Sequence, residues 1–211
     1  MRKTFTRDEL HEHELRMVEE AFAQHQITKR SEGRWLLRRP DSGSYWAEVI
    51  CLAGAQLFVG GDISPVVFGY ADTSGEDRVR WLGGTSDILY YVAQKASIGM
   101  GSDALTKQYD VDVAGADLRA LAKEYEDHEF REGRGIPDCP VQAALDDLAL
   151  CCPDGPERLH EQLREELEPL RADWLLDDRG YLGMVLAPRV YYAWGALARL
   201  TKLLDEEKKG A

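Results

Sequence analysis

Cysteine is scarce in this sequence, and no long uninterrupted apolar run occurs. Four thiols at irregular spacing, two of them adjacent, are too few for the disulfide framework of a small secreted domain. The most apolar stretch, residues 181–204, contains Pro188 and three basic residues, which argues against a membrane span of about 20 nearly uncharged residues. The first residues lack the apolar segment of a secretory signal. We therefore expect a reducing, cytoplasmic environment and no contact with a membrane.

Motifs for known chemistry are also absent. The sequence has no nucleophile elbow, phosphate-binding loop or dinucleotide fingerprint. It has no Cys-x2-Cys pair, and His11 and His13 are two residues apart, so they point to different sides of a helix. We therefore expect no metal site and no cofactor, and we expect the thiols to pack as small apolar groups.

Positive charge is in deficit, and the deficit is uneven. The net charge is -12; residues 1–102 have 12 Lys and Arg against 14 Asp and Glu, whereas residues 103–211 have 14 against 24. Nucleic-acid affinity comes mainly from basic side chains that neutralise phosphates. Direct nucleic-acid binding is therefore disfavoured, and the acidic second half is better suited to a basic surface of another protein.

The first half of the chain has the pattern of a strand meander. Short runs rich in Val, Ile, Phe, Tyr and Trp are separated by Gly or Pro, as in consecutive strands; they are residues 45–52, 56–59 and 65–70. Residues 78–82 alternate charged and apolar side chains and predict an outer strand. After Gly84 the apolar period changes to about 3.6, which predicts a helix from Ser86.

A capping box opens the chain. Thr6 and Glu9 have the spacing at which side chain and backbone amide satisfy each other reciprocally. The pattern predicts a helix to about Gln24. Its expected inward face consists of Leu10, Met17, Val18, Ala21 and Phe22.

The second half has mainly helical periodicity. The predicted helices cover residues 103–109, 116–130, 141–152, 156–168 and a final segment from Pro188. The predicted fold is α+β: a small antiparallel meander over about residues 34–82, packed by the N-terminal helix and by a mostly helical C-terminal half. We expect subdomains at 1–101 and 102–211, or one continuous domain.

One basic run stands out in this acidic chain. Between residues 27 and 44 it consists of Lys29, Arg30, Arg34, Arg38 and Arg39. Arginine side chains could grip a phosphate or a partner carboxylate. We favour the alternative, in which they protect an edge strand around Trp35 from aggregation.

Two groups are candidates for chemistry. The loop Gly60–Pro65 places Asp62 after two glycines at a strand end, where catalytic carboxylates often occur. An ordinary turn explains the same residues, and we favour it. Tyr91 and Lys95 are i, i+4 neighbours that could present a hydroxyl and an amine together, although a snorkelling lysine beside half-buried tyrosines is the favoured interpretation.

A family resemblance covers residues 34–100. The segments GGDISPVVFGY, WLGG and DILYYVAQKASIG resemble uncharacterised proteins of tailed phages and prophages. The resemblance implies a small accessory protein of a mobile element, of a kind that frequently occupies a host protein. It transfers no site residues, because its aromatic and glycine positions form no catalytic signature.

These observations favour a non-enzymatic binding protein in the cytoplasm of a host cell. Its acidic helical half would dock on a basic host or phage protein, such as a defence or nucleic-acid-processing complex, in the manner of an anti-defence inhibitor. The expected binding residues are Glu157, Glu161, Glu165, Glu168, Asp177 and Asp178.

Two alternatives stay open. One is a small hydrolase or nucleotide-binding enzyme centred on Asp62, with Lys95, Tyr91 or His128 nearby. The other is a virion assembly component whose exposed sheet aromatics form an oligomer surface. The sequence predicts neither the identity of the partner nor the oligomeric state.

Overall fold

The chain forms two compact units in a computed structural model, which describes residues 5–42, 46–52, 56–62, 65–69, 75–102, 105–131, 140–176 and 182–210. The sheet unit consists of residues 12–107 and 186–211, and the helical unit consists of residues 1–11 and 108–185. Each unit has its own cluster of buried apolar side chains.

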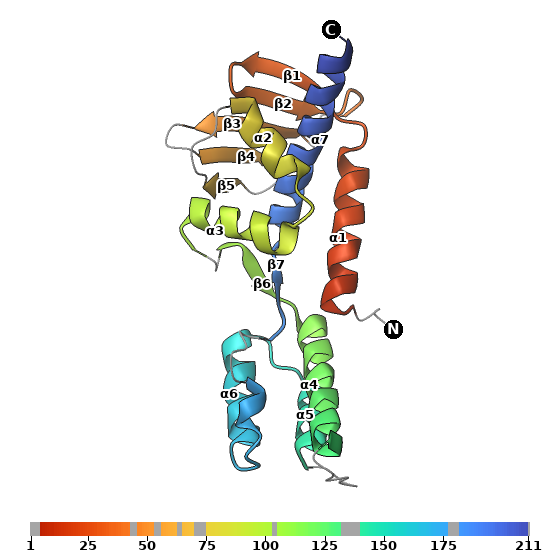
Figure 1. The fold of residues 1–211 in the computed structure, drawn as a ribbon, viewed down its shortest axis with the longest axis vertical. Helices are drawn as coiled ribbons and strands as arrows, with labels where there is room; N and C mark the ends of the chain where they lie inside the picture. The colour runs from red at the N-terminus through yellow and green to blue at the C-terminus, as the bar shows by residue number, and fades with distance from the viewer. Residues whose placement is uncertain are drawn as a thin grey trace. The chain divides into compact units, whose positions relative to one another are not determined.

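A five-stranded antiparallel meander forms the centre of the sheet unit (Figure 1). The strands pair in chain order and are β1 (Gln26–Ser31), β2 (Arg34–Arg38), β3 (Trp46–Leu52), β4 (Gln56–Gly61) and β5 (Val66–Gly69). The predicted α+β fold is thereby confirmed. One detail was wrong: the strand around Trp35 is the interior strand β2, and β1 occupies the edge.

Helices cover one face of this sheet. Alternate residues of the central strands point to the covered face and are fully buried; they include Trp35, Leu37, Val49, Leu57, Val59 and Phe68. The helices α2 (Gly75–Gly84) and α7 (Pro188–Gly210) lie on this face (Figure 1). The last helix therefore packs in the sheet unit's core, whereas the division at residue 102 groups it with the helical half.

The expected outer strand at residues 78–82 is wrong, because this segment belongs to α2. Val79, Leu82 and Gly83 are buried on one side of this helix. Acidic residues in its first turn suit the positive end of the helix dipole. The segment fits both a period of two and a period of 3.6, and the helix buries more of it.

The N-terminal helix α1 (Arg7–Phe22) begins with the predicted capping box. The Thr6 amide donates to Glu9 Oε2 at 2.9 Å, and the Glu9 amide donates to Thr6 Oγ1 at 3.3 Å. Val18 and Phe22 are buried as expected, but Met17 is 42% exposed.

Close packing joins α1 to α7 within the sheet unit. A Cβ atom added at Gly195 would lie 1.9 Å from Val18 Cγ1, so only glycine allows this approach.

The helical unit contains α4 (Val111–Arg131), α5 (Pro140–Leu150), α6 (Pro156–Leu167) and the short 3-10 helix η3 (Asp173–Leu176). Their apolar stripes form its core, which includes Leu118, Leu121, Leu145, Leu159 and Leu163. Helix α4 begins five residues earlier than predicted, because Asp110 Oδ1 accepts from the Val113 amide at 3.0 Å.

The expected helix at residues 103–109 is not formed in its described part. Residues 107–109 form β6 (Lys107–Tyr109), which pairs with β7 (Met184–Leu186) in a two-stranded sheet. Both strands are three residues long, too short for a periodic pattern to identify them.

Candidate functional site

Helix α6 (Pro156–Leu167) has both a typical helix start and the apolar period of a helix. Gly155 precedes it in an extended conformation, Pro156 takes the first position, and Glu157 lies in the first turn, where a negative charge suits the helix dipole. Leucines at intervals of four residues form a buried stripe; they are Leu159, Leu163 and Leu167. This stripe fixes which side of α6 faces solvent.

The predicted binding glutamates lie on the side opposite this stripe. They occur at i, i+4, i+8 and i+11, within an arc of about 80° at 100° per residue. We call the set the acidic face; its members are Glu157, Glu161, Glu165 and Glu168, and all four are exposed. Asp177 and Asp178 lie outside the described residues.

Within the described part of the chain, no ion pair involves a member of the acidic face. Two arginines, Arg158 and Arg164, belong to the same helix and are exposed, yet neither forms an ion pair with these glutamates. The four carboxylates are therefore available to an external cation. Like charges at i, i+4 also repel one another, so apart from the favourable position of Glu157 in the first turn they do not stabilise the helix.

The charge of the whole chain is concentrated in the helical unit. This unit has 11 Lys and Arg against 22 Asp and Glu, whereas the sheet unit has 15 against 16. The asymmetry is sharper than the one seen by dividing the sequence at residue 102, because the final basic residues of α7 return to the sheet unit. The field around the acidic face is accordingly negative.

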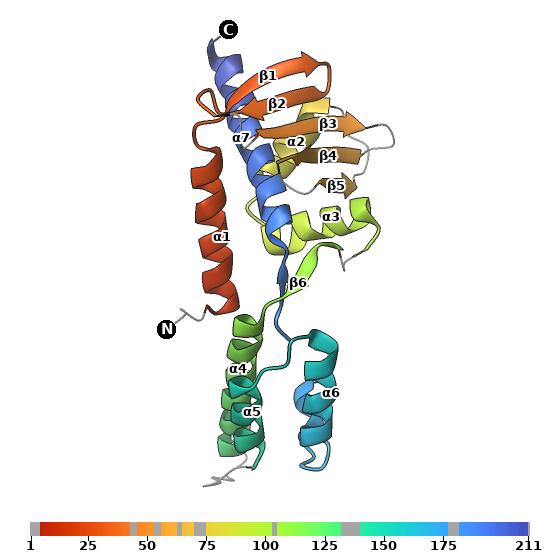
Figure 2. The same ribbon diagram turned by 180° about the vertical axis from the view of Figure 1, so that it is seen from behind.

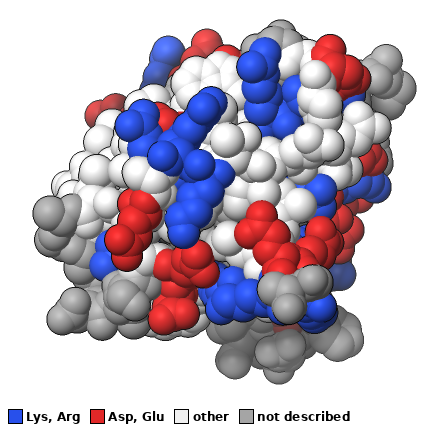
Figure 3. Space-filling model, turned by 90° about the horizontal axis from the view of Figure 1, so that it is seen from above, with Lys and Arg blue, Asp and Glu red and all other residues white. Residues whose placement is uncertain are grey.

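The basic run of residues 27–44 lies on the β1–β2 hairpin, and carboxylates of the sheet unit already pair with much of it. The ion pairs are Lys29 with Glu76 at 3.9 Å, Arg34 with Glu48 at 2.7 Å and Arg39 with Asp41 at 3.5 Å. Figure 3 views the molecule from above and shows basic and acidic side chains interspersed on that face. These ion pairs argue against a dedicated anion site, and because Arg34 and Arg38 lie on the interior strand β2, edge protection concerns only Lys29 and Arg30 of β1.

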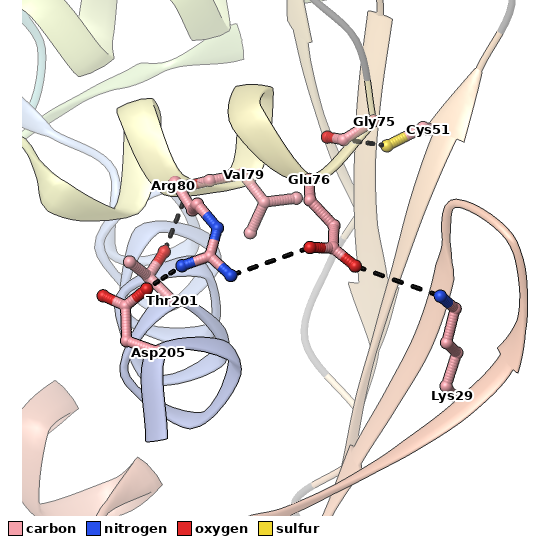
Figure 4. A network of polar contacts seen from close by, with 8 residues as sticks. All are labelled: Lys29, Cys51, Gly75, Glu76, Val79, Arg80, Thr201 and Asp205. Carbon is pink, nitrogen blue, oxygen red and sulfur yellow. Dashed lines mark hydrogen bonds and ion pairs between the residues drawn. The ribbon is translucent and has the colours of Figure 1, made fainter. Parts of the chain in front are cut away.

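One of these pairs belongs to a network that anchors α2 (Figure 4). Glu76 also pairs with Arg80 at 3.6 Å, and Arg80 pairs with Asp205 of α7. Thr201 Oγ1 donates to the Val79 carbonyl at 3.2 Å. Lys29 therefore contributes to the packing of β1, α2 and α7.

Asp62 closes the β3–β4 pair. Its Oδ2 accepts from the Trp46 amide at 3.2 Å, and its own amide donates to the Trp46 carbonyl at 3.1 Å. Gly61 has φ +133°, and a Cβ there would lie 2.2 Å from the Trp46 oxygen. The two glycines and the aspartate thus serve strand closure, with Asp62 bonded across the β3–β4 pair.

The other candidate catalytic groups lie elsewhere. Lys95 Nζ lies 5.2 Å from the centroid of the Tyr91 ring, so the structure brings these two together, and the Tyr91 ring is 5.4 Å from that of Trp81. His128 belongs to the helical unit and contacts Glu129 at 3.5 Å.

A π-helix that the sequence did not predict positions Tyr91. This helix, η1 (Ile88–Val92), precedes α3 (Ala93–Met100). Asp87 Oδ1 caps it by accepting from the Tyr90 amide at 3.2 Å. π-Helical turns are rare and often occur at functional sites.

Two described thiols are held inside their units. Burial raises the pKa of Cys51, whose Sγ donates to the Gly75 carbonyl at 3.5 Å, and burial also raises the pKa of Cys152, which contacts Tyr109 Oη at 3.2 Å. Cys151 is exposed, and Cys139 lies outside the described residues. Over the described ranges, no group of three or more His, Cys, Asp or Glu residues could hold a metal ion.

None of the described helices is long and apolar enough to cross a membrane. No protein-family model matches the chain, and neither the curated proteins nor the solved structures contain a significant match to it. The resemblance of residues 34–100 to phage and prophage proteins therefore stays a prediction.

Proposed function

We propose that this chain is a non-enzymatic binding protein whose acidic face docks on a basic surface of another protein. The observation that supports the proposal is the row of four exposed α6 glutamates without an ion pair in the described part of the chain. The stability of α6 does not account for such a row, because only Glu157 suits the helix dipole and neighbouring members repel one another.

Electrostatics supports docking in two ways. The excess of carboxylates in the helical unit attracts a basic partner over a distance of about one Debye length, roughly 8 Å at physiological ionic strength. On contact, Lys and Arg side chains of the partner replace solvent around carboxylates that form no ion pair with any described residue. Charge complementarity of this kind increases the association rate and gives specificity.

The class of partner follows from the same chemistry. A nucleic-acid-binding groove is a dense array of Lys and Arg, and a row of carboxylates can compete for it. The resemblance to phage and prophage proteins suggests a host defence or nucleic-acid-processing complex. We therefore infer that the protein inhibits such a complex by occupying its basic groove.

Affinity capture from host extract tests the proposal. Wild type is compared with a variant in which Glu157, Glu161 and Glu165 are changed to Lys. The matched control makes the same change at three exposed glutamates of α1 in the sheet unit; these are Glu12, Glu19 and Glu20. Both variants change the net charge equally, so only the position differs.

We expect wild type and the α1 variant to retain one stoichiometric basic protein at low salt and to release it at high salt. The α6 variant should not retain it. Equal loss of binding in both variants would show that only total charge matters. If the α6 variant still retained the basic protein, the acidic face would not be the contact.

A further inference from the structure

On β2 to β5, the face of the meander that points away from α2 and α7 is unusually apolar, whereas the edge strand β1 presents Gln26 and Thr28 on that side. Antiparallel sheets with one solvated face normally show polar side chains there. Here the residues pointing outward include Leu36, Trp46, Ile50, Leu52, Phe58 and Val67, with only Arg34, Arg38 and Glu48 charged on β2 and β3. We call these nine residues the outer face.

Strand register places them together. Arg34 pairs with Ile50, Ile50 with Phe58, and Phe58 with Val67, so one row crosses four strands. A neighbouring row contains Leu36 opposite Glu48. Directly paired residues point to the same side of a sheet, so these rows form one continuous surface.

No described helix of the sheet unit lies across this surface, as Figure 2 shows. Trp46 is 36% exposed and Leu52 39% exposed. Helix α3 lies along β5, where Ile98 contacts Gly69 and is itself 59% exposed, so it extends the apolar surface. A Cβ added at Gly60 would lie 2.6 Å from Phe58 Cζ, which shows that the Phe58 ring lies over Gly60 on the sheet.

We propose that the outer face is a self-association surface on which two copies of this chain pack sheet against sheet. A symmetric interface must be complementary to itself. The outer face meets this condition, because it contains both Arg34 and Glu48, which are 2.7 Å apart within one copy and can also pair across a two-fold axis. The sheet unit is nearly neutral, so two of them approach without strong repulsion.

The size of the surface limits how strongly two copies can associate. The outer face covers four strands about 4.8 Å apart, each about 17 Å long, so its footprint is about 330 Å². Stable interfaces bury about 800 Å² per partner. We therefore expect a reversible dimer with a Kd on the order of 10 μM. A dimer would present two acidic faces per particle and would bind a repetitive partner with avidity.

Sedimentation of the full chain over about 1 to 200 μM tests this inference, because that range spans the expected Kd. We expect the mass to rise from 23.8 kDa toward twice that value. Trp46→Ala and Ile50→Lys should each weaken the dimer at least about tenfold. The matched control is Trp81→Ala, an exposed tryptophan, 48% exposed, on α2. Circular dichroism confirms that each variant is folded.

A charge exchange sharpens the test. Arg34→Glu alone and Glu48→Arg alone each place like charges opposite each other across the two-fold axis, so each should be monomeric. An equimolar mixture of the two restores opposite pairs between copies and should form a heterodimer, which a purely internal role of this ion pair cannot produce. A monomer at every concentration, or a dimer lost in Trp81→Ala but not in Trp46→Ala, would overturn the inference.

Discussion

In the β1–β2 hairpin, three of five basic side chains form ion pairs inside the sheet unit, whereas the acidic face of α6 forms none among the described residues. Exposed ion pairs contribute only about 0 to 1 kcal/mol each, so the difference matters little for stability. It matters for availability: a charge with an internal partner must give it up to bind another molecule. A charged run in a sequence is therefore informative about binding only after its internal partners are known.

Each unit has its own core, and glycine substitutions in the two units should have the largest effects on stability. Gly195→Val would drive a branched side chain into Val18 and should destabilise the sheet unit by about 3 kcal/mol or more. Gly115→Ala in α4 of the helical unit meets its nearest atom at 3.5 Å, and it should stabilise that helix by about 0.5–1 kcal/mol. Thermal unfolding should show these opposite signs.

Large-to-small substitutions test the independence of the cores directly. Leu163→Ala should destabilise the helical unit by about 2–5 kcal/mol, and Leu200→Ala should do the same to the sheet unit. Hydrogen exchange should show that each loss is confined to the unit that contains the substitution. Equal loss of protection throughout the chain would mean that the units unfold as one.

Neutralising charges should have opposite effects in the two regions. Glu161→Gln with Glu165→Gln removes two i, i+4 repulsions and should stabilise the helical unit by up to about 1 kcal/mol at low salt. Lys29→Gln with Arg34→Gln removes two ion pairs and should destabilise the sheet unit by up to about 2 kcal/mol. Denaturant titrations at low and high salt measure both effects. A destabilised α6 variant would show that the two glutamates do have stabilising partners within the protein, contrary to the ion pairs seen among the described residues.

The smallest effect is expected at Asp62. Asp62→Ala removes the acceptor of the Trp46 amide and should cost about 0.5–1.5 kcal/mol, whereas Asp62→Asn keeps an acceptor and should cost less. The hydrolase alternative makes a different prediction: Asp62→Asn, the milder change for stability, should abolish turnover. Stability and hydrolysis assays on both variants separate the two interpretations.

The meander could be predicted because its strands are short runs rich in β-branched and aromatic residues, separated by glycine or proline. The strand predicted for residues 78–82 was wrong because five residues that alternate also place Val79 and Leu82 three apart, on one helical face. Helix η1 and the short strands β6 and β7 depend on backbone geometry and tertiary pairing, which leave no periodic signal.

The position of the acidic face could be predicted from the leucine spacing of α6. That its members form no ion pair with a described residue could not be predicted, because Arg158 and Arg164 have spacings at which i, i+3 and i, i+4 pairs commonly form. In the sequence, the residues of the apolar outer face appear only as part of runs with apolar residues at every position. Such runs predict burial on both sides, and the structure shows burial on one.

The salt dependence of binding to the captured basic protein tests the central claim most directly. Plotting the logarithm of Kd against the logarithm of salt concentration should give a steep slope for wild type and for the Glu12, Glu19 and Glu20 variant. When Glu157, Glu161 and Glu165 are changed to Lys, the slope should become shallow and binding at low salt should weaken at least tenfold. The reason is that fewer charged contacts form on binding, so fewer counterions are released. A slope that is the same in all three proteins, or flat in wild type, would contradict a docking role for the acidic face.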